Sequence, residues 1–344
     1  MVRRESEAAQ ILIIAALVGL SLLALMTGAS ATRPAAQATP TPELAYLPLI
    51  LRQPTATPTT VPNQDWLWYL NQYRAQANLI PLVENSEWSQ GGLYHSRYMV
   101  KNDEITHYED PTNEWYTPEG AAAGPSGNIM LSSWVDAPDE TAIDFWMTAP
   151  FHALSILDPK LQTTGFGSYR ENIGVWKMGA TLDTLRGRGA LPLETVYPLP
   201  YPQDGGESWP LSFGGGEWPD PLTACPDYSP PTGAPVILQI GSGELTPAVT
   251  THNFIQGEAQ LEHCVFDEST YSNPDPYTQS IGRLMLDSRD AIMLLPRHPL
   301  AAGETYQASI TVNEQTISWS FTTANEPLEH TWPAGVMVRG HQEH

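Results

Sequence analysis

Two histidines in the first half of the chain, His95 and His152, are the residues whose chemistry stands out first. Each lies in a segment of helical character beside large apolar residues, His95 in the run His-Ser-Arg-Tyr-Met and His152 two residues after Pro150. Imidazoles from two separate helical segments can converge on one cleft, where they could bind a ligand or a metal ion. The pair is therefore the start of a candidate site.

Three further residues could complete a metal site with this pair. His107 would make a set of three histidines, which could hold zinc with an open fourth position. Glu104 and Glu119 lie in the same loop region and could supply oxygen ligands. The alternative is that an imidazole among Tyr and Trp residues is a hydrogen-bonded cleft residue without a metal. Residue types leave both interpretations open.

The sequence contains no complete catalytic set that we can identify. A hydrolase needs a nucleophile, or an activated water, beside a base. Ser96 adjoins His95, but neighbours in a helix do not share a face. No GxSxG or HExxH motif is present, and both cysteines lie in the other half of the chain. Whether the protein is an enzyme stays open, and the pattern favours binding over catalysis.

The elements that must position these residues are helices interspersed with strands. Asn63 can cap a helix that runs through Asn78, Ser86 a second helix and Asp139 a third. Alternating apolar residues predict strands at 164–169 and 176–182. Helices combined with an antiparallel sheet imply an α-β-α sandwich.

Four pieces of this half carry a family resemblance through their order and spacing: LNQYRAQANLIPLVENSEWSQGGLYHSRYM, SGNIM, FWMTAPFHALSILDP and GFGSY. The segment Trp66 to Leu185 resembles the CAP superfamily of cysteine-rich secretory and plant pathogenesis-related proteins, and most closely its bacterial, disulfide-free branch. The resemblance covers about a third of the chain. It implies the α-β-α sandwich fold and a ligand-binding rather than a catalytic role.

Family members hold two histidines and two carboxylates around a large cleft, which in some binds a divalent cation. The resemblance places the two histidines at His95 and His152, and His107 matches a third that bacterial members often carry. The family's usual Glu is replaced here by Gly127 in the run Ser-Gly-Asn-Ile, so the acidic half of the set is incomplete. Asn128 is expected to fix the loop backbone. The resemblance implies a ligand-binding cleft that consists of His95, His107, His152, Asn128 and Glu119. Zinc or calcium would be an optional cation on the three histidines.

The second half of the chain has the pattern of a β domain. Apolar residues alternate over 236–240, 306–312 and 317–321, with a tight turn at Asn313-Glu314 between the last two runs. Short alternating strands between Pro and Gly turns predict a β-sandwich. The run LAAGETYQASITVNEQTISWSFTT is similar to the last hairpin of bacterial immunoglobulin-like and fibronectin-like modules, which are usually spacers or adhesion units. The predicted fold class is thus α+β, a CAP sandwich followed by an all-β Ig-like sandwich.

The N-terminus indicates the compartment. Two arginines precede an apolar run at 11–26, and small residues follow up to Ala31, which is the layout of a secretory signal cleaved after Ala31. The alternative is an uncleaved membrane anchor. Either places the rest of the chain outside the cytoplasm, at the cell surface or in the extracellular space. An oxidising compartment makes a Cys225–Cys264 disulfide the expected state of the two cysteines.

Net charge limits the partners of the protein, and composition divides the chain into domains and linkers. A formal net charge of −22 argues against nucleic acid as a partner, because like charges repel, and against anionic membrane surfaces. Membrane contact is expected only through the N-terminal segment if it stays uncleaved. The expected layout is a signal or anchor at 1–31, a Pro/Thr-rich linker at 32–62, the CAP domain at 63–189, a turn-rich linker at 190–223, the β-sandwich at 224–324 and a loose tail at 325–344.

Three functions are compatible with these observations. The first is a secreted or surface-tethered protein that binds a small apolar, glycan or peptide ligand in a histidine-lined cleft. The second is a metal-assisted hydrolase of extracellular or envelope polymers. The third is a structural adhesin in which the β-sandwich binds and the cleft is vestigial. The sequence leaves the ligand and the oligomeric state open.

Overall fold

The computed structural model describes residues 66–325 and 335–340, all of which belong to one compact unit. The predicted signal or anchor, the Pro/Thr-rich linker and the histidines His330, His341 and His344 lie outside the described residues. Within the described ranges, no helix has the length and apolar character needed to cross a membrane.

Residues 66–189, here called the helix–sheet part, are built around a four-stranded antiparallel sheet in the order β17-β2-β5-β4. The strand β17 comes from the C-terminal end of the chain, and β1 and β3 form a separate short parallel pair. The elements are α1 (Trp66–Ala75), β1 (Val83–Glu84), α2 (Ser86–Asn102), α3 (Pro118–Ala123), η1 (Gly124–Ser126), β2 (Gly127–Ser132), α4 (Glu140–Thr148), α5 (Pro150–Ile156), β3 (Thr163–Thr164), β4 (Phe166–Arg170), β5 (Met178–Asp183) and β17 (Val338–Arg339).

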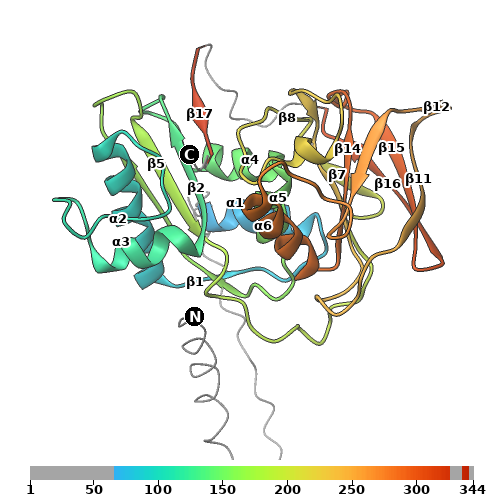
Figure 1. Cartoon of the computed structure of the whole chain (residues 1–344), viewed down its shortest axis with the longest axis horizontal. Helices are drawn as coiled ribbons and strands as arrows, with labels where there is room; N and C mark the ends of the chain where they lie inside the picture. The colour runs from blue at the N-terminus through green and yellow to red at the C-terminus, as the bar shows by residue number, and fades with distance from the viewer. Residues whose placement is uncertain (1–65, 326–334, 341–344) are drawn as a thin grey trace, which may run out of the picture. The chain divides into compact units, whose positions relative to one another are not determined.

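Helices cover both faces of this sheet because its strands are apolar on both faces. In β2, Ile129 and Leu131 join a core cluster with Met99 of α2. Met130 points the other way and joins a larger cluster with Trp146 of α4. Alternation along one strand therefore separates α2 on one face from α1, α4 and α5 on the other (Figure 1).

Two of the predicted helix starts differ from the observed ones. Asn85, and not Ser86, caps α2, since its side-chain oxygen accepts hydrogen bonds of 3.0 and 3.2 Å from two backbone N–H groups of the first turn. Asp139 precedes α4 as predicted but makes no cap hydrogen bond. Its carboxylate instead accepts from Ser168 Oγ and pairs with Arg170 of β4, so it ties the helix start to the sheet.

Residues 190–325, here called the β-rich part, form two larger sheets in the orders β13-β14-β10-β6 and β12-β11-β15-β16-β7, and a small sheet β8-β9. The three predicted alternating runs fall in β10, β15 and β16, and Asn313 and Glu314 form the turn between the last two at φ 49° and 65°. The elements are β6 (Leu199–Tyr201), β7 (Gly206–Ser208), β8 (Ser212–Phe213), η2 (Pro221–Ala224), β9 (Thr232–Gly233), β10 (Val236–Gln239), β11 (Val249–Gln256), β12 (Ala259–Gln260), β13 (His263–Phe266), α6 (Pro276–Asp287), β14 (Ala291–Pro296), β15 (Thr305–Val312) and β16 (Gln315–Thr323).

The β-rich part is not all-β, because α6 lies between β13 and β14. Asp275 caps this helix through a 2.7 Å hydrogen bond from the Thr278 backbone N–H to its carboxylate, and Pro276 occupies the first helical position. Within 190–223, β6 and β7 pair with the two larger sheets and β8 pairs with β9, while residues 338–339 pair with β2. The segments expected to be a linker and a loose tail therefore contribute to the folded structure. Two- and three-residue strands are too short to show alternation in the sequence.

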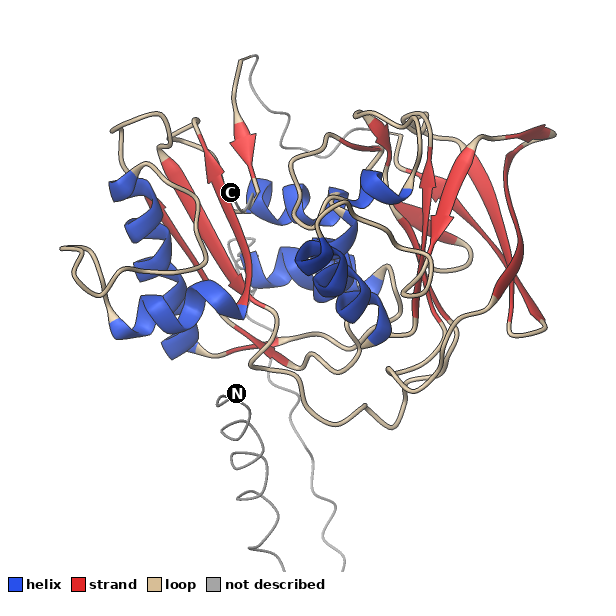
Figure 2. Cartoon of the chain, in the orientation of Figure 1, coloured by secondary structure: helices blue, strands red, loops and turns tan. Residues whose placement is uncertain are grey.

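The sheet β13-β14-β10-β6 is buried on both faces, and this joins the two parts. Leu238 and Leu294 face the second β-sheet in one core cluster. Ile237 and Met293 face the opposite way and share a cluster with Phe151 of α5. Figure 2 shows the resulting order, with α1, α4, α5 and α6 between the sheet of the helix–sheet part and the sheets of the β-rich part. The chain is thus an α+β structure, as the sequence predicts at this coarser level.

The predicted disulfide between Cys225 and Cys264 is confirmed. The two Cα atoms are 5.7 Å apart, and the bond closes a sequence separation of 39 residues. Cys225 follows η2, and Cys264 lies in β13. The cross-link therefore holds the segment before η2, which enters the candidate site, against a strand of the β-rich part.

Candidate functional site

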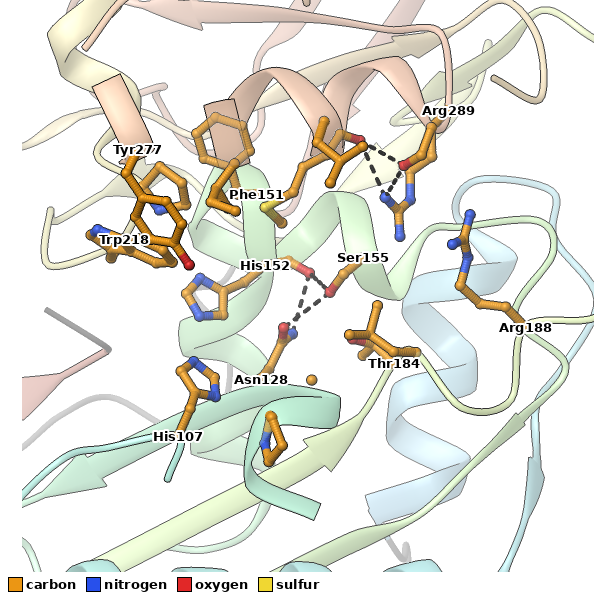
Figure 3. A pocket seen from close by; sticks show the side chains of 18 of the residues that line it. His107, Asn128, Phe151, His152, Ser155, Thr184, Arg188, Trp218, Tyr277 and Arg289 are labelled. Carbon is orange, nitrogen blue, oxygen red and sulfur yellow. Dashed lines mark hydrogen bonds between the residues drawn. The ribbon is translucent and has the colours of Figure 1, made fainter. Parts of the chain in front are cut away.

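A cavity of about 440 Å³ lies where the helix–sheet part meets the β-rich part. One side comes from η1, β2, α5 and the end of β5. The other side comes from Trp218-Pro219 and from the apolar face of α6 (Figure 3). The cavity is therefore composite, and neither part of the chain encloses it alone.

His152 lines this cavity, and its position is fixed by a carboxylate from far along the sequence. Glu217 Oε1 lies 2.7 Å from His152 Nδ1 and 2.7 Å from the His152 backbone nitrogen. Ala149, the residue before α5, makes no side-chain cap. Glu217 therefore caps α5 from outside the helix, where a negative charge also complements the helix dipole.

Glu217 is brought to the site by a glycine turn. Gly215 and Gly216 have φ of 85° and 82°, a region that favours glycine, and they turn the chain so that Glu217 is buried against α5. Burial raises the pKa of the Glu217 carboxyl, and its hydrogen bonds to His152 oppose that effect. With Nδ1 held by this carboxyl, the imidazole has one orientation and offers Nε2 to a ligand.

Asn128 connects β2 to α5 beneath His152. Its amide Nδ2 donates to the His152 carbonyl oxygen at 3.3 Å, and its Oδ1 accepts from Ser155 Oγ at 3.0 Å. Ser155 Oγ also lies 2.7 Å from the His152 carbonyl oxygen. Figure 3 shows this triangle of hydrogen bonds at the cavity wall. The Ser155 hydroxyl is occupied by these contacts and is not hydrogen-bonded to a base, so the arrangement supports backbone positioning.

His107 also lines the cavity, at the same end as His152, Trp218 and Tyr277 (Figure 3). Its Nδ1 lies 2.6 Å from the Gly124 carbonyl oxygen. This contact ties the irregular loop after α2 to η1. Of the five residues expected in the cleft, the structure thus brings His107, Asn128 and His152 together.

His95 does not line the cavity, and the expectation that it shares a groove with His152 is not met. Its side chain is fully buried, with Nδ1 3.0 Å from Glu109 Oε1 and Nε2 2.8 Å from the Thr106 carbonyl oxygen. Both ring nitrogens therefore hold the loop that follows α2. Gly124 lies against the ring so closely that a Cβ there would overlap His95 and the His107 carbonyl oxygen.

Two carboxylates were not expected from the sequence, and two expected ones lie elsewhere. Glu119, on α3, and Glu104 are exposed and do not line the cavity. The buried acids that contact these histidines are Glu109, beside His95, and Glu217, beside His152. The sequence did offer one signal for a residue such as Glu217. The helix that starts at Ala149-Pro150 has no side-chain cap of its own, so its N–H groups require an acceptor from elsewhere.

The donor set for a metal ion is not gathered at the cavity. In residues 66–325 and 335–340, no three His, Cys, Asp or Glu side chains lie close enough to hold one. His95 is engaged at both ring nitrogens, and His107 and His152 each have Nδ1 engaged. His95, one of the three histidines that the sequence suggested as metal ligands, therefore lies apart from the cavity that His107 and His152 line.

The end of the cavity opposite the two histidines is basic. Arg188 and Arg289 line it, and both pair with the buried carboxylate of Asp158. Neither arginine was singled out in the sequence, because one follows β5 and the other follows α6, about a hundred residues later. The cavity thus has a histidine end, an arginine end and apolar side chains between them.

The comparisons with known proteins place a family in the first of the two parts. Residues 67–175 match the family model "CAP: Cysteine-rich secretory protein family". No curated protein matches the chain. The matched segment includes His107, Asn128 and His152 but ends before Arg188 and Glu217. Residues 67–175 in the helix–sheet part are therefore similar to the CAP family, and the cavity is completed by residues beyond the matched segment.

Proposed function

We propose that this protein is an exported CAP-domain protein that binds a small, mainly apolar ligand in the composite cavity. The observation that carries the proposal is the cavity itself, about 440 Å³ in volume, whose exposed lining is mainly apolar, with polar side chains at its two ends and along one wall. Small-molecule sites in proteins have this size and this composition.

The apolar face of α6 supports the same proposal. Tyr277, Ile281, Leu284 and Met285 line the cavity at helical spacing. Tyr277 is 55% exposed and Leu284 is 60% exposed, so two large apolar side chains of this helix remain in contact with water. Apolar side chains gathered at the mouth of a cavity are typical of a binding site, because a ligand removes them from water.

Export is part of the proposal. The Cys225–Cys264 disulfide is stable in oxidising compartments and rare in the cytosol, so it supports the signal or anchor that residues 1–31 predict. The net charge of −22 is compatible with a protein that stays away from nucleic acid.

The test uses 1-decanol, an uncharged apolar probe, with the chain expressed without residues 1–31. A ligand that binds the folded state raises the thermal midpoint, so decanol is expected to raise it in the wild type. Leu284→Glu should remove this shift, since it puts a charge at the mouth of the cavity. Leu193→Glu is the matched control, because Leu193 is 101% exposed and lies outside the cavity. No midpoint shift in the wild type would contradict the proposal.

One observation favours a second candidate, hydrolysis with His152 as a general base. A base held by a carboxylate at one ring nitrogen can accept a proton from water at the other. The direct test is turnover of 4-nitrophenyl decanoate by the wild type and by His152→Ala. Equal, background-level rates in both proteins would eliminate this candidate and leave binding as the function of the cavity.

A further inference from the structure

We propose that the ligand is an amphipathic monocarboxylate whose carboxylate binds at Arg188 and Arg289, with its apolar chain along α6. The inference rests on the proposed function and deepens it, because it names the chemical class of the ligand and its orientation. The two arginines come from different parts of the chain, Arg188 after β5 and Arg289 after α6, and Figure 3 shows them together at one end of the cavity.

The charges at this end do not balance. Arg188 Nε lies 2.7 Å, and Arg289 Nη2 3.0 Å, from the same oxygen of Asp158, so two guanidinium groups share one carboxylate. Arg74 is a third nearby cation, which donates to the Asp158 carbonyl oxygen at 3.1 Å. At the cavity wall itself, two guanidinium groups therefore face one carboxylate, which leaves one positive charge there in a chain whose net charge is −22.

The two arginines also retain hydrogen-bonding capacity. A guanidinium has five N–H donors. Among the described residues, the only side-chain hydrogen bond of Arg188 is the one from Nε to Asp158. Arg289 donates through Nη1 to the Met285 carbonyl oxygen and to Ser288 Oγ, while its Nε is buried without a partner in the described part of the chain. Buried donors without partners cost free energy, which a ligand oxygen would recover.

Arg289 needs an anion beyond Asp158 for a second reason. Its side chain is only 4% exposed. Burial lowers the pKa of Arg289, Asp158 opposes that effect, and the charge of Arg188 adds to it. An anion between the two guanidinium groups would offset both the burial and the mutual repulsion. The end of α6 carries a partial negative charge, so the arginines, and not the helix, must supply the attraction.

The chemistry of the site favours a carboxylate among the anions. The planar guanidinium fork matches the two oxygens of a carboxylate. One unbalanced positive charge is neutralised by a monoanion, whereas a phosphate monoester would bring close to two negative charges. From Tyr277 to the end of α6 at Asp287 the helix rises about 15 Å at 1.5 Å per residue, which is long enough for an extended apolar chain. Ile281, Leu284 and Met285 would contact that chain.

The experiment compares three ten-carbon probes on the same protein: decanoate, 1-decanol and decyl phosphate. Dissociation constants are measured by calorimetry at pH 7.5. The wild type should bind decanoate at least about tenfold more tightly than decanol, as expected for one charge-assisted hydrogen-bonded pair. Arg188→Gln should reduce decanoate affinity to that of decanol and leave decanol affinity unchanged. Arg188→Lys, which keeps the charge but not the fork, should give an intermediate value.

Arg186→Gln is the matched control. The side chains of Arg186 and Arg188 are both 29% exposed, and each pairs with one aspartate, but Arg186 lies outside the cavity. The control should bind all three probes like the wild type. Decanol affinity measured in each variant reports whether the cavity is still folded.

The outcomes separate this inference from the proposed function. Equal affinities for decanoate and decanol in the wild type would overturn the carboxylate inference and leave apolar binding intact. Tightest binding of decyl phosphate would replace the carboxylate by a phosphate head group. Decanoate binding that is unchanged by Arg188→Gln would also overturn the inference, since the head group would then lie elsewhere. Failure of both decanol and decanoate to bind would remove the proposed function itself.

Discussion

Glu217 Oε1 lies 2.7 Å from the backbone nitrogen of His152 and 2.7 Å from its ring nitrogen Nδ1, although the two residues are 65 positions apart. Glu217 belongs to a segment beyond the residues that match the CAP family model, and His152 lies within them. One carboxyl thus caps α5, orients the imidazole and joins the segment that carries Trp218 to the cavity. The site depends on this contact between the two parts of the chain.

Replacing Glu217 should therefore affect both stability and binding. Glu217→Leu leaves the His152 backbone N–H and ring N–H without a buried acceptor, which should lower the free energy of unfolding by about 2–4 kcal/mol, at about one to two kcal/mol for each group. Glu217→Gln keeps an acceptor oxygen and should lose less. Urea unfolding of the two variants measures the difference. Equal losses in both would show that the carboxyl oxygen is not the important acceptor.

The Asp144 carboxyl predicts a pH dependence of stability. Tyr69 and Tyr73 donate hydrogen bonds of 2.7 and 2.8 Å to it, but burial is the larger effect and raises the pKa of Asp144 to about 7. A carboxyl whose pKa is raised on folding binds more protons in the folded state between about pH 4 and pH 7. Its stabilising contribution is complete below about pH 4 and is lost as the pH rises to about 7.

The test of this dependence is a comparison of Asp144→Asn with the wild type. The amide keeps an oxygen for the two tyrosines and does not titrate. The free energy of unfolding, measured at pH 5 and at pH 8, should fall more in the wild type than in Asp144→Asn. The expected excess is about 2–3 kcal/mol, because a tenfold difference in proton affinity corresponds to about 1.4 kcal/mol. Parallel pH profiles would contradict the raised pKa of Asp144.

Gly124 lies against both His95 and His107. A Cβ there would overlap the His95 ring and the His107 carbonyl oxygen, so Gly124→Ala should cost about 1–3 kcal/mol as an overpacked site. Gly214→Ala is the control, since nothing lies within 4 Å of a Cβ there. Chemical denaturation compares the two, and a similar stability for both variants would mean that the loop can move away without cost.

Zinc or calcium should leave the purified protein unchanged. Because no three-donor cluster occurs within the described residues, the thermal midpoint of protein treated with a chelator is expected to stay constant when either ion is added. Differential scanning fluorimetry is sufficient for this measurement. A rise that is lost in His107→Ala would instead establish a cation at the histidine end of the cavity.

Local sequence signals predicted much of the fold. Asn313-Glu314 between two alternating runs predicted the β15–β16 hairpin, and both residues adopt the left-handed conformation that this turn requires. Alternating apolar residues predicted the strands at 164–169 and 176–182, which correspond to β4 and β5. The compartment argument predicted the pairing of Cys225 and Cys264. Each of these inferences needed only neighbouring residues or residue types.

The site was harder to predict because its decisive contacts are distant in sequence. Helical spacing shows that His95 lies on an apolar face, but it does not show whether that face meets a cavity or a loop. Here Glu109 and the Thr106 carbonyl oxygen occupy both of its nitrogens. The helix α6 had a local signal, Asp275-Pro276 followed by apolar residues at helical spacing, that the alternating strands around it obscured.

The two residues of β17 determine whether the edge of β2 is covered, which matters when the protein is shortened for experiments. Val338 and Arg339 pair with Ser132 and Leu131, so β2 is an interior strand of its sheet. A truncated product that stops near residue 325 would bare the backbone donors and acceptors along β2. Such an unprotected border invites pairing with a second molecule, and oligomers or precipitates of a shortened protein should be attributed to this lost strand before any natural assembly is inferred.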